Sequence, residues 1–578
     1  MTSLSLKQLW QQISEDPDHV FLAAPGHELS YGALGMRIRI ELARFDAAGL
    51  VLGQRLLIRT ADETAAIVLF LAGLLDGLIP VMLAPGTPDD RLSAISALVE
   101  PGLTCQSAST GHAPADRDPR LPGDPDETAY ILFTSGTTQS PSGVRITRRN
   151  ILSNLATISR LFGCDRGSRI FNDMILAHAD GLVQGPLLAL ASGATLIRSG
   201  GFSLQGMESW LDRVRETRAT HVITVPTIWS LIDRFAKRDD YFQAPDCRAL
   251  MSVAAKLDQA LWQRIETRFG RTVYNQYGLT ETVTSALYAG PHPEMGASGT
   301  IGKPVDCTAR IGALPGSAVM PDGAGELQLR GDNIFPGYWK NPTRSAESFT
   351  PNGWFKTGDI ARLLPDGSYA FLGRIKSSII MAGFLIRPDE IDEALMKHPA
   401  VSESVTVAMA DAEFDEIPVA AVVLKSEATE AELAAHARRS LEPLKVPKRI
   451  IAFDTIPRGD AGKPNLQAVR DLLATSVHSP AHLSGDTNDE IDKRLIELAA
   501  LVFGVEQASL TVASTPQSVE GWDSFKLVNL VLQAEELFSI RIPGRFVGQI
   551  DSLGALSSII RKARAGIPLR QQGPASGP

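Results

Sequence analysis

The stretch "YILFTSGTTQSPSGVRITRRN", residues 130–150, decides how the rest of the chain is interpreted. An apolar run typical of a strand leads directly into a loop of small and hydroxylated residues: Thr134, Ser135, Gly136, Thr137 and Thr138. Such a loop buries little apolar surface, but glycine lets backbone amides point into one concavity and the hydroxyls add further donors. The stretch therefore suits the binding of phosphate oxygens, and an ordinary polar turn after a strand is the alternative.

The composition is that of a soluble globular protein with several folding units. A chain of 578 residues is too long for one hydrophobic core, and its 44% hydrophobic and 21% charged residues are ordinary for globular domains. The formal net charge of -9 provides no basic field for a polyanion. We therefore expect no nucleic-acid partner, whereas a small anionic ligand in a cleft remains compatible with this charge.

Cysteine usage and hydropathy favour a cytoplasmic protein without a membrane partner. The start of the chain, "MTSLSLKQLW", lacks the basic and apolar regions of a secretory signal. The most apolar stretch, "AAIVLFLAGLLDGLIPVMLAPG" from Ala65, is interrupted by Asp76 and Pro80, and it predicts a buried helix followed by a buried strand. The cysteines are scattered without metal-ligand spacing, as expected in a reducing compartment: Cys105, Cys164, Cys247 and Cys307.

The periodicity of the sequence changes along the chain and predicts an α/β protein with further domains. Residues 1–372 alternate strand and helix patterns, as in a large layered α/β domain with mainly parallel strands and some antiparallel ones near "GELQLRG" and "GSYAFLG". Residues 373–475 resemble a small α+β domain. Residues 476–487 have the composition of a flexible linker, residues 488–566 show the apolar spacing of an all-α four-helix bundle, and residues 567–578 form a disordered tail.

Four further stretches follow the opening loop in order: "YNQYGLTET" from Tyr274, "GWFKTGDIARLLPDG" from Gly353, "GRIKSSIIMAGFLIRPDEID" from Gly373, and "PRGDAGKPN" from Pro457. Together with the loop they resemble the adenylate-forming (ANL) superfamily of acyl-CoA synthetases, acyl and aryl acid ligases, luciferases and peptide-synthetase adenylation domains. The resemblance covers about residues 10 to 473. It implies an ATP-dependent, AMP-forming ligase that converts a carboxylate into an acyl adenylate and expels pyrophosphate.

The resemblance also implies roles for individual residues. The loop residues Thr134 to Thr138 hold the pyrophosphate part of ATP, and Thr280 contacts phosphate. Tyr277 lies against adenine, Glu281 binds Mg²⁺, and Asp359, with Arg374 nearby, accepts from the ribose hydroxyls. Lys463 is the mobile lysine that bridges the substrate carboxylate and the phosphate. Lys376 lies at the hinge about which the small domain rotates between adenylation and thiol acceptance.

The C-terminal stretch "VEGWDSFKLVNLVLQAEELFSIRIP" resembles acyl and peptidyl carrier proteins. The resemblance implies that Ser524 carries 4'-phosphopantetheine, and an N-cap serine before an apolar run is the alternative. It also implies a phosphopantetheinyl transferase and downstream enzymes as partners. Tethering the thiol to the adenylating module would raise its local concentration and make free coenzyme A unnecessary.

Two regions depart from the family pattern. The family loop usually has a second glycine and a lysine before Gly143, but this chain has Gln139, Ser140, Pro141 and Ser142. The loss of a cation beside pyrophosphate weakens charge neutralisation, and Arg145 and Arg148 are candidate replacements. Val253 stands where relatives often have a smaller residue near the acyl site, so the sequence predicts a narrow pocket for a small substrate.

The substrate class rests on "LAHADGLVQGPLL". His178 to Gly181 resemble the His-x-x-Gly of acyl and aryl acid ligases, but Asp180 also falls where amino-acid-activating domains bind the α-ammonium group. A small carboxylic acid is the first expectation, and an amino acid, as in a nonribosomal peptide synthetase-like didomain, is the second. A coenzyme A ligase with a vestigial carrier and a catalytically silent, carrier-presenting protein remain alternatives for the whole chain.

Overall fold

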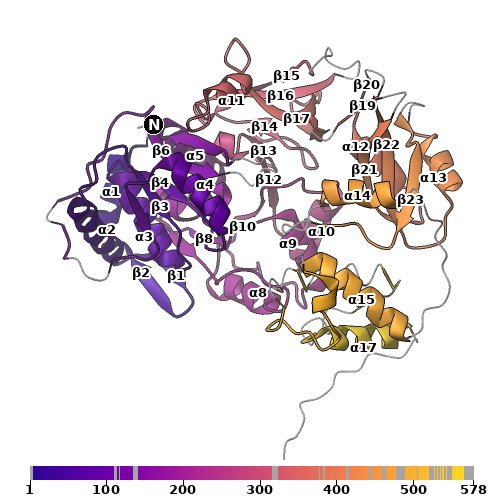
Figure 1. Cartoon of the computed structure of the whole chain (residues 1–578). Coiled ribbons are helices and arrows are strands. Elements are labelled where there is room, and N and C mark those ends of the chain that lie inside the picture. The colour runs from indigo at the N-terminus through magenta and orange to yellow at the C-terminus, as the bar shows by residue number, and fades with distance from the viewer. Residues whose placement is uncertain are drawn as a thin grey trace, which may run out of the picture. The chain divides into compact units, whose positions relative to one another are not determined.

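The computed structural model describes most of the chain. The described residues are 4–109, 113–115, 117–133, 141–314, 323–375, 378–381, 384–411, 415–441, 445–458, 464–476, 488–503, 505–519, 522, 526–527, 530–531, 534, 537–538, 540, 542 and 550–564. They divide into two compact units, Met1–Phe202 with Met207–Phe371, and Ser203–Gly206 with Leu372–Pro578. Figure 1 draws the first unit from indigo to pink and the second mainly in orange and yellow.

The first unit contains a long mixed sheet that is parallel at its centre. In spatial order its strands are β14 (Lys303–Pro304), β13 (Leu287–Ala289), β12 (Val273–Tyr277), β11 (Ala249–Ser252), β10 (His221–Thr224), β8 (Arg169–Asn172), β9 (Thr195–Ile197), β1 (Val20–Ala24) and β2 (His27–Ser30). Strands from β12 to β1 pair in parallel, and the outer strands β13, β14 and β2 pair antiparallel. This arrangement confirms the predicted α/β layering with largely parallel strands.

A second sheet carries the opening stretch of the sequence. Its order is β5 (Leu103–Cys105), β3 (Arg55–Ile58), β4 (Ile79–Met82), β6 (Thr128–Phe133) and β7 (Gly143–Thr147). The strands from β5 to β6 are parallel, whereas β7 runs antiparallel to β6. The apolar stretch from Ala65 forms α3 (Glu63–Leu75) and β4, which are buried almost throughout, as the sequence predicts.

Helices alternate with these strands, as expected where parallel strands need crossover connections. They are α1 (Leu6–Glu15), α2 (Tyr31–Ala47), α3, α4 (Asp89–Val99), α5 (Arg148–Phe162), α6 (Ala179–Leu182), the π-helix η1 (Val183–Leu187), α7 (Leu188–Ser192), α8 (Met207–Glu216), α9 (Pro226–Phe235), α10 (Gln259–Phe269), the 3₁₀ helix η2 (Thr280–Thr282) and α11 (Pro342–Glu347). Among the helices that the structure describes, none combines the length and apolarity of a membrane span.

A capping box fixes the junction between β7 and α5. The Thr147 hydroxyl accepts from the Asn150 amide at 3.2 Å, and the Asn150 side-chain oxygen accepts from the Thr147 amide at 2.9 Å. The Asn150 side-chain nitrogen also donates to the carbonyls of Asp332 and Ile334, at 2.7 and 2.9 Å. The end of the opening stretch is thereby attached to the segment around residue 333.

The last sheet of the first unit is antiparallel, with the order β15 (Cys307–Gly312), β16 (Ala324–Gly331), β17 (Phe355–Leu363) and β18 (Tyr369–Arg374). β16 pairs antiparallel with both β15 and β17, which confirms the prediction for "GELQLRG". Antiparallel neighbours need no crossover helix, although α11 lies in the connection between β16 and β17.

The second unit begins with a small α+β body. Its sheet has the order β20 (Phe384–Ile386), β19 (Ile379–Met381), β22 (Asp415–Leu424) and β21 (Val401–Asp411), and β23 (Arg449–Phe453) pairs parallel with β22. The helices α12 (Pro388–Met396), α13 (Glu430–Ala437) and α14 (Leu466–Ser476) accompany it. Apolar side chains on the two faces of the sheet form two separate clusters, one under α12 and α13 and the other under α14.

The residues beyond 487 have a hydrophobic core of their own. α15 (Asn488–Phe503) buries Leu495 and Leu498, and α17 (Leu553–Arg564) buries Leu553 and Leu556 in the same cluster. The 3₁₀ helix η5 (Gln507–Ser509) follows α15. Asp492 joins the two helices, because its carboxylate accepts from the Ser557 hydroxyl and from the Arg561 guanidinium.

A buried histidine in the central sheet is expected to make the stability of the first unit depend on pH. His221 on β10 donates from Nε2 to the Phe162 carbonyl at 2.9 Å, and Nδ1 lies 2.7 Å from the Thr220 hydroxyl. Burial lowers the pKa of His221 from 6.5 to about 4. Since the unfolded chain takes up the proton at a higher pH, the contribution of His221 to stability is complete above pH 6.5. It is lost as the pH falls to about 4.

We expect the first unit to lose up to about 3 kcal/mol of stability from this residue between pH 6.5 and pH 4. His221→Gln retains an amide donor for the Phe162 carbonyl but does not titrate, so its stability should fall less steeply over this range. Urea unfolding at several pH values measures the difference. Equal slopes for the two proteins would show that His221 is not the titrating group.

Candidate active site

The end of β12 and the middle of β17 bring two predicted nucleotide-binding residues together. Tyr277 donates its hydroxyl to Asp359 Oδ2 at 2.7 Å, although the two residues are 82 positions apart. Asp359 is only 1% exposed, and its backbone amide donates to the Thr357 hydroxyl at 3.1 Å. The carboxylate is therefore held in one orientation beside an aromatic ring.

A tight turn after β12 presents Thr280 and Glu281. A side chain at Gly278 would place its Cβ 1.8 Å from the Thr284 carbonyl oxygen, so only glycine fits there. The Leu279 amide donates to the Thr282 hydroxyl at 2.9 Å, which closes the turn around η2. Thr280 is half-buried, and Glu281 is buried.

Glu281 has a partner that sequence reasoning missed. The Tyr338 hydroxyl donates to Glu281 Oε1 at 2.8 Å, and the Phe335 amide donates to the Glu281 carbonyl at 2.9 Å. Burial, together with the adjacent Glu281 charge, raises the pKa of Tyr338 well above its ordinary value, so the phenol stays protonated and keeps donating. One carboxylate oxygen is thus fixed by Tyr338.

The predicted acid-pocket residues lie on α6 and at the end of β11. Asp180 is buried, and its Oδ1 accepts from the Gln184 side chain at 2.9 Å, while Oδ2 lies 3.5 Å from Nδ1 of the exposed His178. Val253 is buried directly after β11, where its amide donates to the Thr224 carbonyl at 3.1 Å.

A chain of buried amides connects Asp180 to β12. Gln276, next to Tyr277, donates to the Gln184 side-chain oxygen at 3.1 Å, and Ser285 donates to the Gln276 side-chain oxygen at 2.7 Å. No local pattern marks Gln184 or Gln276 as members of a network, because a glutamine in the sequence does not by itself indicate whether its side chain is buried. Only the pairing of distant elements reveals them.

Arg374 ends β18 with an exposed side chain and belongs to the second unit. The other predicted site residues lie outside the described residues: Thr134, Ser135, Gly136, Thr137, Thr138, Lys376, Lys463 and Ser524. Their assigned roles remain predictions.

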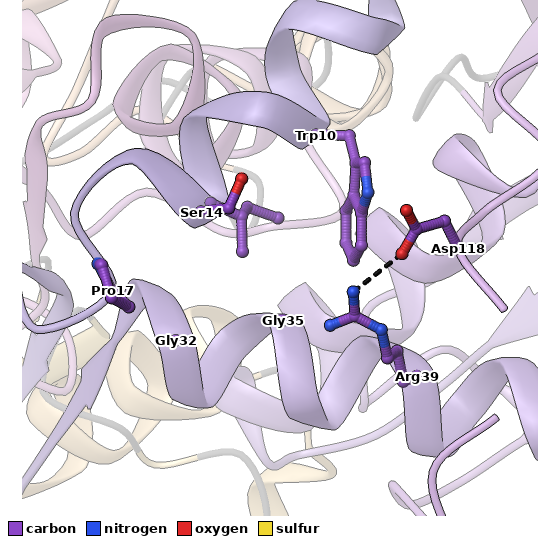
Figure 2. A pocket seen from close by; sticks show the side chains of 8 residues that line it. Trp10, Ser14, Pro17, Gly32, Gly35, Arg39 and Asp118 are labelled. Carbon is purple, nitrogen blue, oxygen red and sulfur yellow. Dashed lines mark hydrogen bonds and ion pairs between the residues drawn. The ribbon is translucent and has the colours of Figure 1, made fainter. Parts of the chain in front are cut away.

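A pocket of about 450 Å³ near the N-terminus includes none of the predicted site residues (Figure 2). It lies along α1 and α2, where the Arg39 guanidinium stands over the Trp10 ring at 4.9 Å and pairs with Asp118 at 2.7 Å. Because its cation is already paired, we assign no catalytic role to this pocket.

The chemistry of the described donors fits a magnesium nucleotide. Glu281 provides a buried carboxylate, and Mg²⁺ prefers carboxylate and phosphate oxygens. Asp359 provides a second, separately oriented carboxylate that suits vicinal hydroxyl groups. These two acids and Tyr277 all belong to the first unit.

Comparisons with known proteins agree with this arrangement. The family model described as AMP-binding enzyme matches residues 101–339, and that of the AMP-binding enzyme C-terminal domain matches residues 390–463. Sulfoacetate–CoA ligase of Cupriavidus necator is 33% identical over 483 residues, covering 77% of this chain and 93% of that protein. Oxalate–CoA ligase of Arabidopsis thaliana is 34% identical over 364 residues, covering 62% of this chain and 70% of that protein.

The fold has a close counterpart among solved structures. ATP-bound MatB from Rhodopseudomonas palustris superposes with a TM-score of 0.71 and 23% identity, covering 82% of this chain and 100% of that one. At this identity the likeness establishes the fold, and the family matches establish the kinship. The chain therefore belongs to the AMP-binding enzyme family of adenylate-forming, ATP-dependent acid ligases, as the opening loop and the four following stretches predict.

Proposed function

We propose that the enzyme adenylates a small carboxylic acid and transfers the acyl group to a phosphopantetheine thiol on its own C-terminal carrier domain. The observation that carries this proposal is the separate hydrophobic core of α15 and α17, which follows both matched family domains. A ligase with the two matched domains alone would have no need of this third core. The phosphopantetheine arm supplies the thiol that accepts the acyl group.

The residues on either side of Ser524 are anchored to the end of α15. Trp522 stacks on the Phe503 ring, with centroids 4.5 Å apart, and Lys526 donates to the Phe503 carbonyl at 3.0 Å. These contacts of Trp522 and Lys526, which are four residues apart, support Ser524 as the attachment position on the carrier domain.

The hydrogen bonds of Asp180 support a carboxylic acid over an amino acid. An aspartate that selects an α-ammonium group needs carboxylate oxygens available for that cation. Here Oδ1 of Asp180 accepts from Gln184 and Oδ2 faces His178. The two curated relatives, named for sulfoacetate and oxalate, point to compact acids with a second anionic group as the first candidates.

A coenzyme A ligase is the second candidate, because both of these relatives are CoA ligases. The two functions share adenylation and differ only in the thiol that attacks the acyl adenylate and releases AMP. Tethering favours the carrier thiol through its higher local concentration.

The intact mass of the full chain separates the candidates. The protein is treated with a phosphopantetheinyl transferase and coenzyme A, freed of coenzyme A, and then given Mg²⁺, ATP and a panel containing sulfoacetate, oxalate and amino acids. We expect a pantetheine increment, followed by an ATP-dependent acyl increment. Ser524→Ala should lose both, whereas Ser518→Ala, which removes an exposed hydroxyl from the same region, should keep both.

Absence of the pantetheine increment would overturn the carrier proposal. Formation of acyl-CoA from free coenzyme A at equal rates in wild type and Ser524→Ala, without acylation of the protein, would establish the CoA ligase instead. Absence of any adenylation with the whole panel would favour the silent, carrier-presenting protein.

A further inference from the structure

Five cations lie on the described segments 141–149, which follow the opening loop, and 337–344, which pairs with them: Arg145, Arg148, Arg149, Lys340 and Arg344. Arg149 pairs with Asp126 at 2.8 Å. Arg148 is 4% exposed and pairs with Glu127 at 2.6 Å, so its charge is neutralised. Lys340 pairs with Glu100 at 2.9 Å. All three cations therefore already have a carboxylate partner.

Arg145 is directed away from the loop. Its Nε donates to the hydroxyl of Thr128 at 3.1 Å, and Thr128 begins β6, whereas the loop sequence follows the other end of that strand. The expectation that Arg148 replaces the missing loop lysine is therefore wrong, because Arg148 pairs with Glu127. The orientation of Arg145 does not support the same role for that residue.

Arg344 differs from the other four cations. Its guanidinium donates to the Ser142 hydroxyl, and its Cζ lies 4.1 Å from the centroid of the Tyr338 ring. No carboxylate of the described residues lies within ion-pair distance of this guanidinium. The half-buried side chain therefore brings an uncompensated positive charge to position 142.

Backbone pairing explains why a residue 202 positions away reaches Ser142. The Trp339 amide donates to the Gly143 carbonyl at 2.7 Å, and the Arg145 amide donates to the Gly337 carbonyl at 3.2 Å. The segment 337–339 thus lies along the start of β7. The chain then enters α11, whose Asn341 cap accepts from the Arg344 amide at 3.0 Å.

The same segment connects Arg344 to the predicted magnesium ligand. Tyr338 supports the guanidinium with its ring and donates its hydroxyl to Glu281 at 2.8 Å. The Arg344 guanidinium therefore lies over the ring of Tyr338, and the Glu281 carboxylate lies at the hydroxyl of the same residue. This pairing suits a metal-bound polyphosphate, because the carboxylate takes the metal while the guanidinium binds phosphate oxygens.

We propose that Arg344 binds the β- and γ-phosphates of ATP and the departing pyrophosphate, supplying the charge that the loop lacks at Ser142. In adenylation a substrate carboxylate oxygen bonds to the α-phosphorus, and the bond from that phosphorus to the bridging oxygen breaks. The electron pair leaves with pyrophosphate, and Arg344 offsets the negative charge that develops there. This inference rests on adenylation and is independent of the carrier proposal.

Binding of three ligands to the full-length protein, measured by calorimetry, tests the proposal. Arg344→Ala should weaken binding of MgATP and of magnesium pyrophosphate by about 10- to 100-fold, the range expected for one lost charge-assisted contact. AMP, which lacks the β- and γ-phosphates, should bind with unchanged affinity. The control Arg149→Gln removes a cation of α5 that pairs with Asp126, and it should leave all three affinities unchanged.

A positive charge introduced at position 142, the hydrogen-bond partner of Arg344, provides a second test. The double variant S142K/R344A should recover MgATP affinity to within about fivefold of wild type, since the lysine places a cation at the same position. Equal weakening of AMP and MgATP by Arg344→Ala would show a structural role and overturn the proposal. Unchanged MgATP affinity in Arg344→Ala would overturn it as well. Neither result depends on Ser524, so failure of this proposal can be distinguished from failure of the carrier function.

Discussion

Replacing Glu281 with glutamine is expected to slow adenylation by about 100- to 1,000-fold, the range for losing one preorganised electrostatic group. Glutamine keeps the shape of the side chain and can still accept from Tyr338, but it lacks the charge that Mg²⁺ prefers. The fold should remain intact, because the hydrogen bond to Tyr338 is retained. ATP–pyrophosphate exchange with the acid identified by the loading experiment measures the loss.

Tyr338→Phe is the matched variant for this prediction. It leaves the Glu281 charge in place and removes only the hydroxyl that orients it, so a smaller loss of about 10- to 100-fold is expected. Part of that loss should be recovered at high Mg²⁺ concentration. If Glu281→Gln exchanged pyrophosphate within threefold of wild type at low Mg²⁺, Glu281 would not be the metal ligand.

Replacing Asp359 with alanine is expected to weaken ATP binding by about 100- to 1,000-fold, since two charge-assisted hydrogen bonds to the ribose would be lost. The diagnostic result is a change in preference. Wild type should bind ATP far more tightly than 2',3'-dideoxy-ATP, and Asp359→Ala should bind the two nucleotides alike. Calorimetry with both nucleotides measures the two affinities without needing the substrate acid.

Tyr277→Phe controls for the position of the Asp359 carboxylate. It removes the 2.7 Å hydrogen bond but keeps the ring and the acid, so we expect about a tenfold loss and a retained preference for the ribose hydroxyls. Should Asp359→Ala keep the wild-type ratio between ATP and the dideoxynucleotide, Asp359 would act only as a support for Tyr277.

Much of the fold could be predicted from local patterns. The apolar run from Ala65 predicts the buried α3 and β4 because burial on all sides requires an unbroken apolar sequence. The strand at Tyr130 is similarly marked by a short apolar run, and the strand ending at Tyr277 by residues that favour β-structure. Tyr277, Glu281 and Asp359 could be predicted as site residues because each lies within a recognisable motif, and their roles stay predictions.

The cation at Ser142 could not be predicted in the same way. Arg145 and Arg148 are near the loop in sequence, and proximity along the chain made them the natural candidates. Arg148 instead pairs with Glu127, and Arg344 reaches Ser142 from a helix far along the chain. Side-chain direction on a strand and pairing between remote segments decide such contacts, and neither is encoded in local spacing.

The sequence by itself determined the family, the order of the elements and the acidic and aromatic residues predicted for the nucleotide site, because motifs and apolar periodicity are local properties. The tertiary structure alone decided that Tyr338 orients Glu281, that amides connect Asp180 to β12, and that Arg344 lies at Ser142. The physical reason is that a buried polar group must find a partner wherever the fold places one. That partner is selected by the pairing of distant strands and turns, which no short stretch of sequence specifies.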